Sequence, residues 1–315
     1  ARPGLVAPQD GRPAVDLAEL VARVGGALLR DADDEPRDAI GPEDGAAGQP
    51  VAVVSEATAR ALWPGESAVG RRLSLGPEGE LNDKLTDNTM ETCNTHNMLK
   101  LTRHLFALDP GAHFMDFYER ALYNHILASQ DPDDGMVCYF VPLRMGTKKE
   151  FSDTEHSFTC CVGTGMENHV KYGESIFFKS SDGGLYVNLF IPSKLNWKEK
   201  DLKVTLQSNL SEGSDKILLS VEPGKKTTFP MYIRKPYWAG EGIVVRVNGK
   251  PEKVVLSNTG YIELNRTWTK GDQVELRFPM DVYALSMPDN ADRKAFFYGP
   301  VLLAGDMGEQ EPDPT

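Results

Sequence analysis

Between residues 91 and 132 the apolar residues recur every three or four positions, which is the spacing of amphipathic helices. Asp109-Pro110 interrupts the pattern and ends the first of two helices. The residues expected to face inward are Met98, Leu99, Leu101, Leu105, Phe106, Phe114, Phe117, Leu122, Ile126 and Leu127. Because the connection is short, we expect the two helices to pack as an antiparallel pair.

The pattern changes twice after the helix pair. Residues 137–143 form a short, strand-like apolar run, and residues 160–178 are expected to turn into a third helix after a bend at Gly163-Thr164-Gly165. From about residue 184 the apolar period becomes two, in short segments, and VNGKP (247–251) and TKGDQ (269–273) are hairpin signals. This part of the chain is therefore predicted to be an antiparallel β-sandwich over residues 184–315.

The choice of basic residues marks a boundary nearer the N-terminus. Residues 1–83 contain eight arginines and no lysine, whereas residues 84–315 contain 18 lysines and eight arginines. Such a switch has no folding rationale and suggests that the two parts have different origins. We therefore expect residues 1–76 to be a separate αβ fragment with an acidic linker. Residues 50–76 resemble the periplasmic domain of MacB-type ABC-transporter permeases, although an ordinary αβ fragment fits them equally well.

Composition narrows the class of protein. The 315-residue chain is 40% apolar and 25% charged, which is ordinary for a globular protein, and it has no apolar run long enough to span a membrane. A net charge of −12 argues against a nucleic-acid partner and is compatible with a neutral substrate such as a sugar. Four cysteines are too few for a disulfide scaffold. No secretory signal is visible, and the compartment stays open.

Two of the four cysteines, Cys160 and Cys161, are adjacent in the sequence FTCCVG. They are open to three interpretations: buried apolar residues, a vicinal disulfide, or two ligands of one soft metal ion. Glu91 and Cys93 stand at the expected start of the first helix, where both side chains can turn toward one point. Three thiolates and a carboxylate would suit four-coordinate zinc. Spacing alone does not decide, because E-x-C is not a standard zinc pair.

Three longer motifs point to a family. They are ETCNTHNMLKLTRHLF (91–106), FYERALYNHIL (117–127) and CCVGTGMENHVKYGESIFF (160–178). The chain from about residue 76 to residue 308 resembles the β-L-arabinofuranosidase family of glycoside hydrolases, families 127 and 146, once a domain of unknown function. The resemblance implies a retaining exo-glycosidase built on an (α/α)6 barrel followed by β-sandwich domains. It also implies an arabinose-containing oligosaccharide or glycan as the substrate.

The resemblance assigns roles to particular residues. It implies that Glu91, Cys93, Cys160 and Cys161 bind zinc and that Cys160 is the nucleophile. It implies further that Glu119, in the YER motif, is a substrate-binding carboxylate. His156 lies four residues before Cys160, close enough to help bind the sugar, although a solvated loop histidine fits as well.

The chain also departs from the family. The position of the family's general acid falls on Leu73, which cannot donate a proton, and the nearest carboxylates are Glu78 and Glu80. Residues 77–183 supply only the last helices of a barrel. We therefore expect an α+β multidomain chain, with a partial barrel between the N-terminal fragment and the sandwich, that is weakly active or inactive. The alternative is a catalytically dead, zinc-stabilised or carbohydrate-binding module.

The remaining candidates have ordinary structural interpretations. Cys138 lies in an apolar run and is expected in the core. Glu167 and His169 are expected to stabilise the start of a helix, with a contact to the metal site as the alternative. Tyr139 and Trp197 are expected to pack, with sugar stacking as the alternative. Packing is also the expectation for the histidines of the two helices, which are His96, His104, His113 and His125.

Overall fold

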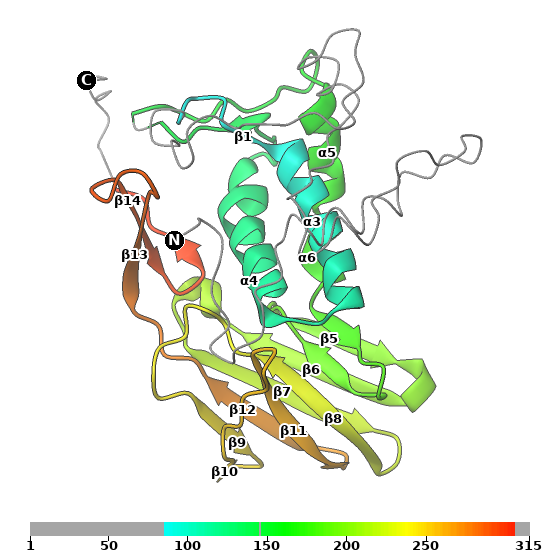
Figure 1. The fold of residues 1–315 in the computed structure, drawn as a ribbon. Helices are drawn as coiled ribbons and strands as arrows, with labels where there is room; N and C mark the ends of the chain where they lie inside the picture. The colour runs from blue at the N-terminus through cyan, green and yellow to red at the C-terminus, as the bar shows by residue number, and fades with distance from the viewer. Residues whose placement is uncertain (1–84, 145, 306–315) are drawn as a thin grey trace, which may run out of the picture. The chain divides into compact units, whose positions relative to one another are not determined.

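The computed structural model describes residues 85–144 and 146–305 (Figure 1). The predictions for residues 1–76, including the position of Leu73, lie outside the described residues. Within them, the fold mixes helices with several mainly antiparallel sheets, as expected for an α+β chain. None of the described helices is long and apolar enough to cross a membrane.

The predicted helix pair is present. Helix α3 (Thr92–Leu108) and helix α4 (Ala112–Ala121) lie side by side and are joined by the predicted short turn (Figure 1). The chain of α4 continues through a π-helical turn, η3 (Leu122–Ile126), and a 3-10 turn, η4 (Leu127–Ser129). Most of the predicted apolar positions face inward, but Phe117 and Leu127 are 42% and 46% exposed, so the inward assignment was wrong for these two.

The sandwich consists of a six-stranded sheet in the order β10-β9-β12-β7-β6-β5 and a four-stranded sheet in the order β11-β8-β4-β3. Its strands are β3 (Phe177–Lys179), β4 (Leu185–Val187), β5 (Ser193–Trp197), β6 (Leu202–Ser208), β7 (Lys216–Pro223), β8 (Thr227–Arg234), β9 (Val244–Val247), β10 (Lys250–Pro251), β11 (Tyr261–Trp268) and β12 (Asp272–Arg277). Neighbouring strands are antiparallel except for β4 and β8. Buried and exposed residues alternate along β6 and β12, so one face of the six-stranded sheet enters the core.

The turns confirm one hairpin prediction and correct the other. Asn248 and Gly249 have positive φ values of 53° and 76°, as a two-residue hairpin turn requires, and they join β9 to β10. The sequence TKGDQ instead joins β11 of one sheet to β12 of the other, so it makes no hairpin. The end of the predicted third helix is also wrong, because Phe177–Lys179 forms β3, an edge strand of the four-stranded sheet.

The last described strands lie outside the two sheets of the sandwich. β13 (Val282–Ser286), β14 (Lys294–Tyr298) and β15 (Val301–Leu302) form a separate antiparallel sheet. It is attached to the helices through Asn124, whose side chain donates to the Pro300 carbonyl at 2.9 Å and accepts from the Leu302 amide at 2.7 Å. The two sheets of the sandwich predicted over 184–315 therefore end at Arg277, and β13, β14 and β15 do not belong to them.

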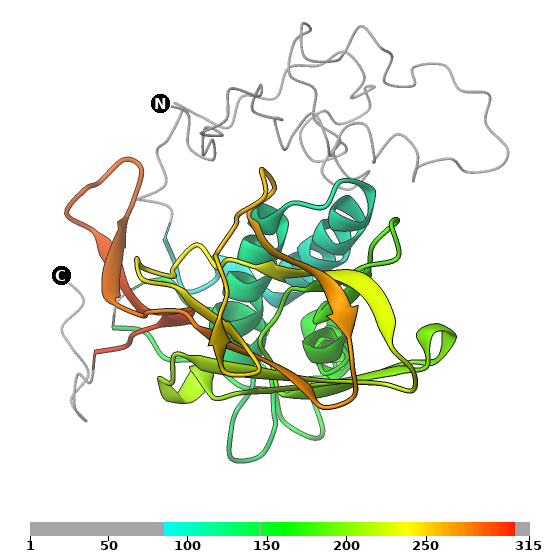
Figure 2. The same cartoon turned by 90° about the horizontal axis from the view of Figure 1, so that it is seen from below.

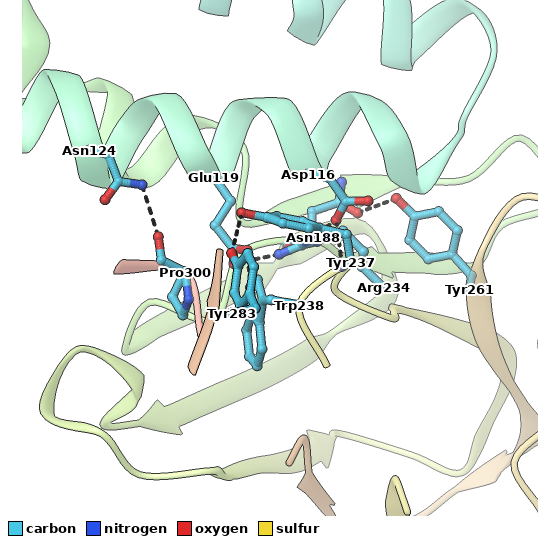
Figure 3. A network of polar contacts seen from close by, with 10 residues as sticks. All are labelled: Asp116, Glu119, Asn124, Asn188, Arg234, Tyr237, Trp238, Tyr261, Tyr283 and Pro300. Carbon is cyan, nitrogen blue, oxygen red and sulfur yellow. Dashed lines mark hydrogen bonds and ion pairs between the residues drawn. The ribbon is translucent and has the colours of Figure 1, made fainter. Parts of the chain in front are cut away.

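The helix pair meets the sandwich near the turn that joins the two helices, where the Ala112 amide donates to the Thr259 carbonyl at 2.8 Å just before β11 (Figures 1 and 2). Phe106 of α3 packs against the rings of Phe178, Tyr186 and Tyr261, with centroid distances of 4.7, 5.4 and 6.3 Å. Arg234, at the end of β8, lies beside the α4 carboxylates (Figure 3). The aromatic contacts of Phe106 and the ion pairs of Arg234 together hold the helices against the sandwich.

Candidate metal centre

One half of the site is built where a short strand turns into helix α3. β1 (Met90–Glu91) pairs with β2 (Phe140–Val141), and Thr92 follows as the first helical residue. The Thr92 amide donates to the Tyr139 carbonyl at 3.1 Å, and the Thr92 hydroxyl lies 3.1 Å from the carbonyls of both Cys138 and Tyr139. These bonds fix the turn, so that Glu91 stands at the N-cap and Cys93 in the first turn of the helix.

The other half is the start of helix α5 (Cys160–Asn168). The predicted bend at Gly163-Thr164-Gly165 was wrong, because these residues lie inside the helix. A Cβ on Gly165 would stand 2.7 Å from a methyl group of Val137, so glycine is needed there for close packing rather than for a turn. Cys160 has a φ of 20°, a sparsely populated conformation for a residue other than glycine, which costs on the order of 1–3 kcal/mol.

The two halves bring together the four predicted metal ligands. One ligand atom from each of Glu91, Cys93, Cys160 and Cys161 lies within 4.8 Å of all the others. The Sγ atoms of Cys93 and Cys160 are 3.4 Å apart, and the Cys161 Sγ lies 3.6 Å from Glu91 Oε1. The Cys93 amide donates to the Cys161 Sγ at 3.3 Å. The ligands therefore stand together although 67 residues separate Cys93 from Cys160 in the chain.

The two adjacent cysteines have different environments. Cys161 is fully buried and Cys160 is exposed, and both are free thiols, which rules out a vicinal disulfide in this structure. A hydrogen bond from the Tyr139 hydroxyl, helped by one from Cys93, holds the pKa of the Cys160 thiol below its usual value. Burial raises the pKa of the Cys161 thiol. Cys160 and Cys161 stand at the N-terminus of α5, and Cys93 stands at the N-terminus of α3. At such positions the helix dipole favours a thiolate.

The group could hold a metal ion. In a tetrahedral zinc site with Zn–S bonds of about 2.3 Å, neighbouring ligand atoms stand about 3.8 Å apart. The 3.4 Å and 3.6 Å separations are close to that edge length, so a small adjustment would admit the ion. Three sulfurs and one oxygen are a donor set typical of zinc rather than of magnesium or calcium.

The two predicted substrate-binding residues do not join this group. Glu119 is 1% exposed on α4, where one carboxylate oxygen pairs with Arg234 and the other accepts from the Trp238 indole at 2.8 Å (Figure 3). That burial gives its predicted contact with a sugar no support. The His156 ring is exposed, 3.8 Å from Asp153, in the loop before α5. The sugar-binding roles of Glu119 and His156 stay predictions.

Two residues near the cysteines were missed or undervalued at the level of sequence. Packing or sugar stacking is the expectation for Tyr139, but its hydroxyl is the largest cause of the lowered pKa of the Cys160 thiol. The Thr164 hydroxyl lies 2.9 Å from the Cys93 Sγ, although its position had suggested only a bend. Neither could be found from periodicity, because each contact joins separate segments of the chain. Glu167, the predicted alternative contact to the site, instead faces His96 at 3.5 Å and Lys100 at 3.8 Å.

Comparisons with known proteins agree with this geometry. Residues 68–174 match the family model described as "Beta-L-arabinofuranosidase, GH127 catalytic domain", and residues 184–280 match the GH127 middle domain. The catalytic model begins inside residues 50–76, and neither family model supports the MacB-type resemblance predicted for that stretch; the two models leave residues 1–67 unmatched. No curated protein matches the chain significantly.

Solved structures show the same relationship. A GH127 β-L-arabinofuranosidase from Geobacillus stearothermophilus is 25% identical, with a TM-score of 0.60 over 69% of this chain and 37% of that one. A glycoside hydrolase is also 25% identical, with a TM-score of 0.60 over 69% of this chain and 38% of that one. A GH127 β-arabinofuranosidase is similar in fold: it is 23% identical, with a TM-score of 0.59 over 67% of this chain and 36% of that one. The chain thus spans well under half the length of these structures. With both of its matched domains drawn from one family, the chain belongs to the GH127 β-L-arabinofuranosidase family.

Proposed function

We propose that this chain carries the nucleophile and metal-binding part of a retaining β-L-arabinofuranosidase site. Cys160 is the nucleophile, and Glu91, Cys93, Cys160 and Cys161 are the ligands of a zinc ion. The substrate is an arabinose-containing oligosaccharide or glycan. The observation that carries the proposal is the exposed Cys160 thiol standing in a four-ligand group whose other members are partly or fully buried.

The division of labour follows from exposure and charge. When bound, zinc would supply the positive charge that keeps the thiols deprotonated at neutral pH. Cys161, buried and 3.6 Å from Glu91, holds that part of the ligand set in place. Cys160 is open to a sugar, and the Tyr139 hydroxyl stabilises its negative charge.

The reaction proceeds in two steps. The Cys160 sulfur attacks the anomeric carbon, a C–S bond forms, and the glycosidic C–O bond breaks with its electron pair going to the leaving oxygen, which takes a proton. Water then attacks the same carbon, the C–S bond breaks, and the thiolate is restored while a proton is released. Two displacements at one carbon retain its configuration.

The proposed site lacks an assigned general acid to give a proton to the leaving oxygen. The family position of the general acid falls on Leu73, and Glu91 is the one carboxylate within the ligand group. General acid catalysis is typically worth about 10²–10⁴ in rate. Activity should therefore be low on natural glycans and better on a nitrophenyl β-L-arabinofuranoside, whose leaving group needs little protonation. Leu73 also favours the second candidate, a zinc-stabilised module that binds sugar without turnover.

The test is hydrolysis of that nitrophenyl substrate, combined with mass spectrometry of the Cys160 peptide after acid quenching. We expect slow turnover and a pentosyl adduct on Cys160, both abolished in Cys160→Ala. Cys138→Ala is the matched control, because Cys138 is fully buried and lies outside the ligand group, so that it should retain turnover. Turnover that survives in Cys160→Ala would refute the nucleophile assignment. Stoichiometric zinc without turnover or adduct would favour the non-catalytic module.

A further inference from the structure

His125 is a buried histidine that the proposed chemistry does not use. It is 3% exposed and lies in the π-helical turn Leu122–Ile126. Its Nδ1 atom is 2.7 Å from the Thr95 hydroxyl on α3, and its buried Nε2 atom has no hydrogen-bond partner within the described part of the chain. Thr95 lies two residues after Cys93. The ring therefore holds the start of the helix that presents Cys93.

The π-helical turn explains how one residue can reach this segment. π-helical turns are rare and are frequently found at functional sites, because the extra residue changes the direction of the side chains that follow. Here Asn124 binds the backbone of Pro300 and Leu302 in the separate sheet, while the next residue, His125, faces α3. Because Asn124 ties the turn from its other side, the histidine ring is held in place.

Burial suits the ring to this task. Desolvation lowers the pKa of His125 to about 4, so the ring is neutral at pH 7, with one donor and one acceptor nitrogen. A neutral imidazole can bond the Thr95 hydroxyl without adding charge behind the ligands. The opposite side of the segment is already held by Thr92 and by the β1–β2 pairing. His125 supplies the support on the other side.

We propose that His125 is a positioning residue of the metal centre, which fixes Thr95 and with it the start of α3, so that the Cys93 thiol stands ready to bind the ion. The inference rests on the proposed metal site. Sites of this kind need their groups within about 0.5 Å of the working geometry, and the Cys93 amide lies 3.3 Å from the Cys161 sulfur. Loss of the ring would free one side of the segment and disturb that register.

The test measures metal binding rather than activity. Zinc affinity is determined by competition with a chelator, and Co²⁺ is used as a spectroscopic probe, whose d–d and thiolate charge-transfer bands report ligand geometry. We expect His125→Ala to weaken zinc binding about 10–100-fold, the range typical for residues that orient metal ligands. His125→Gln, which keeps a donor and an acceptor, should recover part of the loss. Thr95→Val should weaken binding as well, and adding it to His125→Ala should cost less than the sum of the two losses.

A control separates positioning from stability. The Tyr118 hydroxyl is buried and donates to the Lys171 carbonyl, a contact that does not involve the start of α3. Tyr118→Phe should lower the free energy of unfolding but leave zinc affinity within about twofold of the wild type. If the wild type binds zinc and the His125 and Thr95 variants bind it equally well with unchanged Co²⁺ bands, this inference is overturned while the proposed metal site stands. If the wild type binds no zinc, both are overturned.

Discussion

Replacing Arg234 with methionine should destabilise the fold by about 3–5 kcal/mol at neutral pH, the usual result of removing one partner from a buried ion pair. The Arg234 side chain is fully buried between the sandwich and α4 and is paired with both Asp116 and Glu119 (Figure 3). Its Nε also donates to the Asn188 carbonyl at 2.7 Å. Methionine keeps much of the volume and removes the charge, so the two carboxylates lose their counter-ion.

The burial of the partners sets the size of this effect. The Glu119 side chain is 1% exposed and that of Asp116 is 16% exposed, so water can solvate neither carboxylate well. Burial already raises the pKa of Glu119, an effect that Arg234 opposes. In Arg234→Met that opposition is gone, so the pKa of Glu119 in the folded protein rises further. In the unfolded chain the same carboxyl group binds a proton only near its ordinary pKa of about 4.3. The loss should therefore be largest at neutral pH and should shrink as the pH falls toward 4.

The assay is urea unfolding followed by circular dichroism and tryptophan fluorescence at pH 7 and pH 4.5. The double variant Arg234→Met/Glu119→Gln should recover part of the stability at pH 7, because one uncompensated charge is removed. Glu119→Gln alone should lower stability while leaving the Cys160 chemistry intact. If Arg234→Met loses less than about 1 kcal/mol, or loses equally at both pH values, the charged contact does not hold the helices to the sandwich. If Glu119→Gln instead abolishes sugar binding at unchanged stability, the predicted substrate-binding role of Glu119 is right.

Three further outcomes are expected. Cys161→Ser should sharply reduce zinc binding in a chelator competition, whereas Cys138→Ser should leave it nearly unchanged; equal losses would contradict the ligand assignment. Gly249→Ala should lower the free energy of unfolding, measured by urea denaturation, by about 1–2 kcal/mol, because Gly249 has a positive φ of 76°. Gly173 lies in helix α6 (Lys171–Glu174) with open space around it, so Gly173→Ala should raise the free energy of unfolding by up to about 1 kcal/mol. In the metal-free protein the pKa of His125 is lowered to about 4, below the usual 6.5, so the contribution of His125 to stability is complete above pH 6.5 and is lost as the pH falls toward 4. His125→Gln should flatten that part of the pH–stability curve. An unchanged slope would show that the ring is not buried as described.

Local patterns in the sequence were enough to predict much of the secondary structure. The spacing of apolar residues indicated the helix pair, and alternation indicated most of the sandwich strands, because these features depend on which face of an element is buried. Asn248-Gly249 predicted its own hairpin, since two adjacent residues with positive φ are required by the turn itself. The ligand group Glu91, Cys93, Cys160 and Cys161 was predicted through the family motifs, whereas spacing by itself left three interpretations open.

Tertiary structure decided the rest, because the deciding contacts join distant segments. Glu119 depends on Arg234, 115 residues away, and no local pattern distinguishes that partner from a sugar hydroxyl. Phe177–Lys179 became a strand because the four-stranded sheet offered it an edge, and TKGDQ crosses between sheets because β11 and β12 had other partners. Gly165 lies inside a helix because Val137 packs against it. His125 could be assigned only to packing from its helix, since the π-helical turn points its ring toward Thr95 of α3, a direction that the sequence period does not contain.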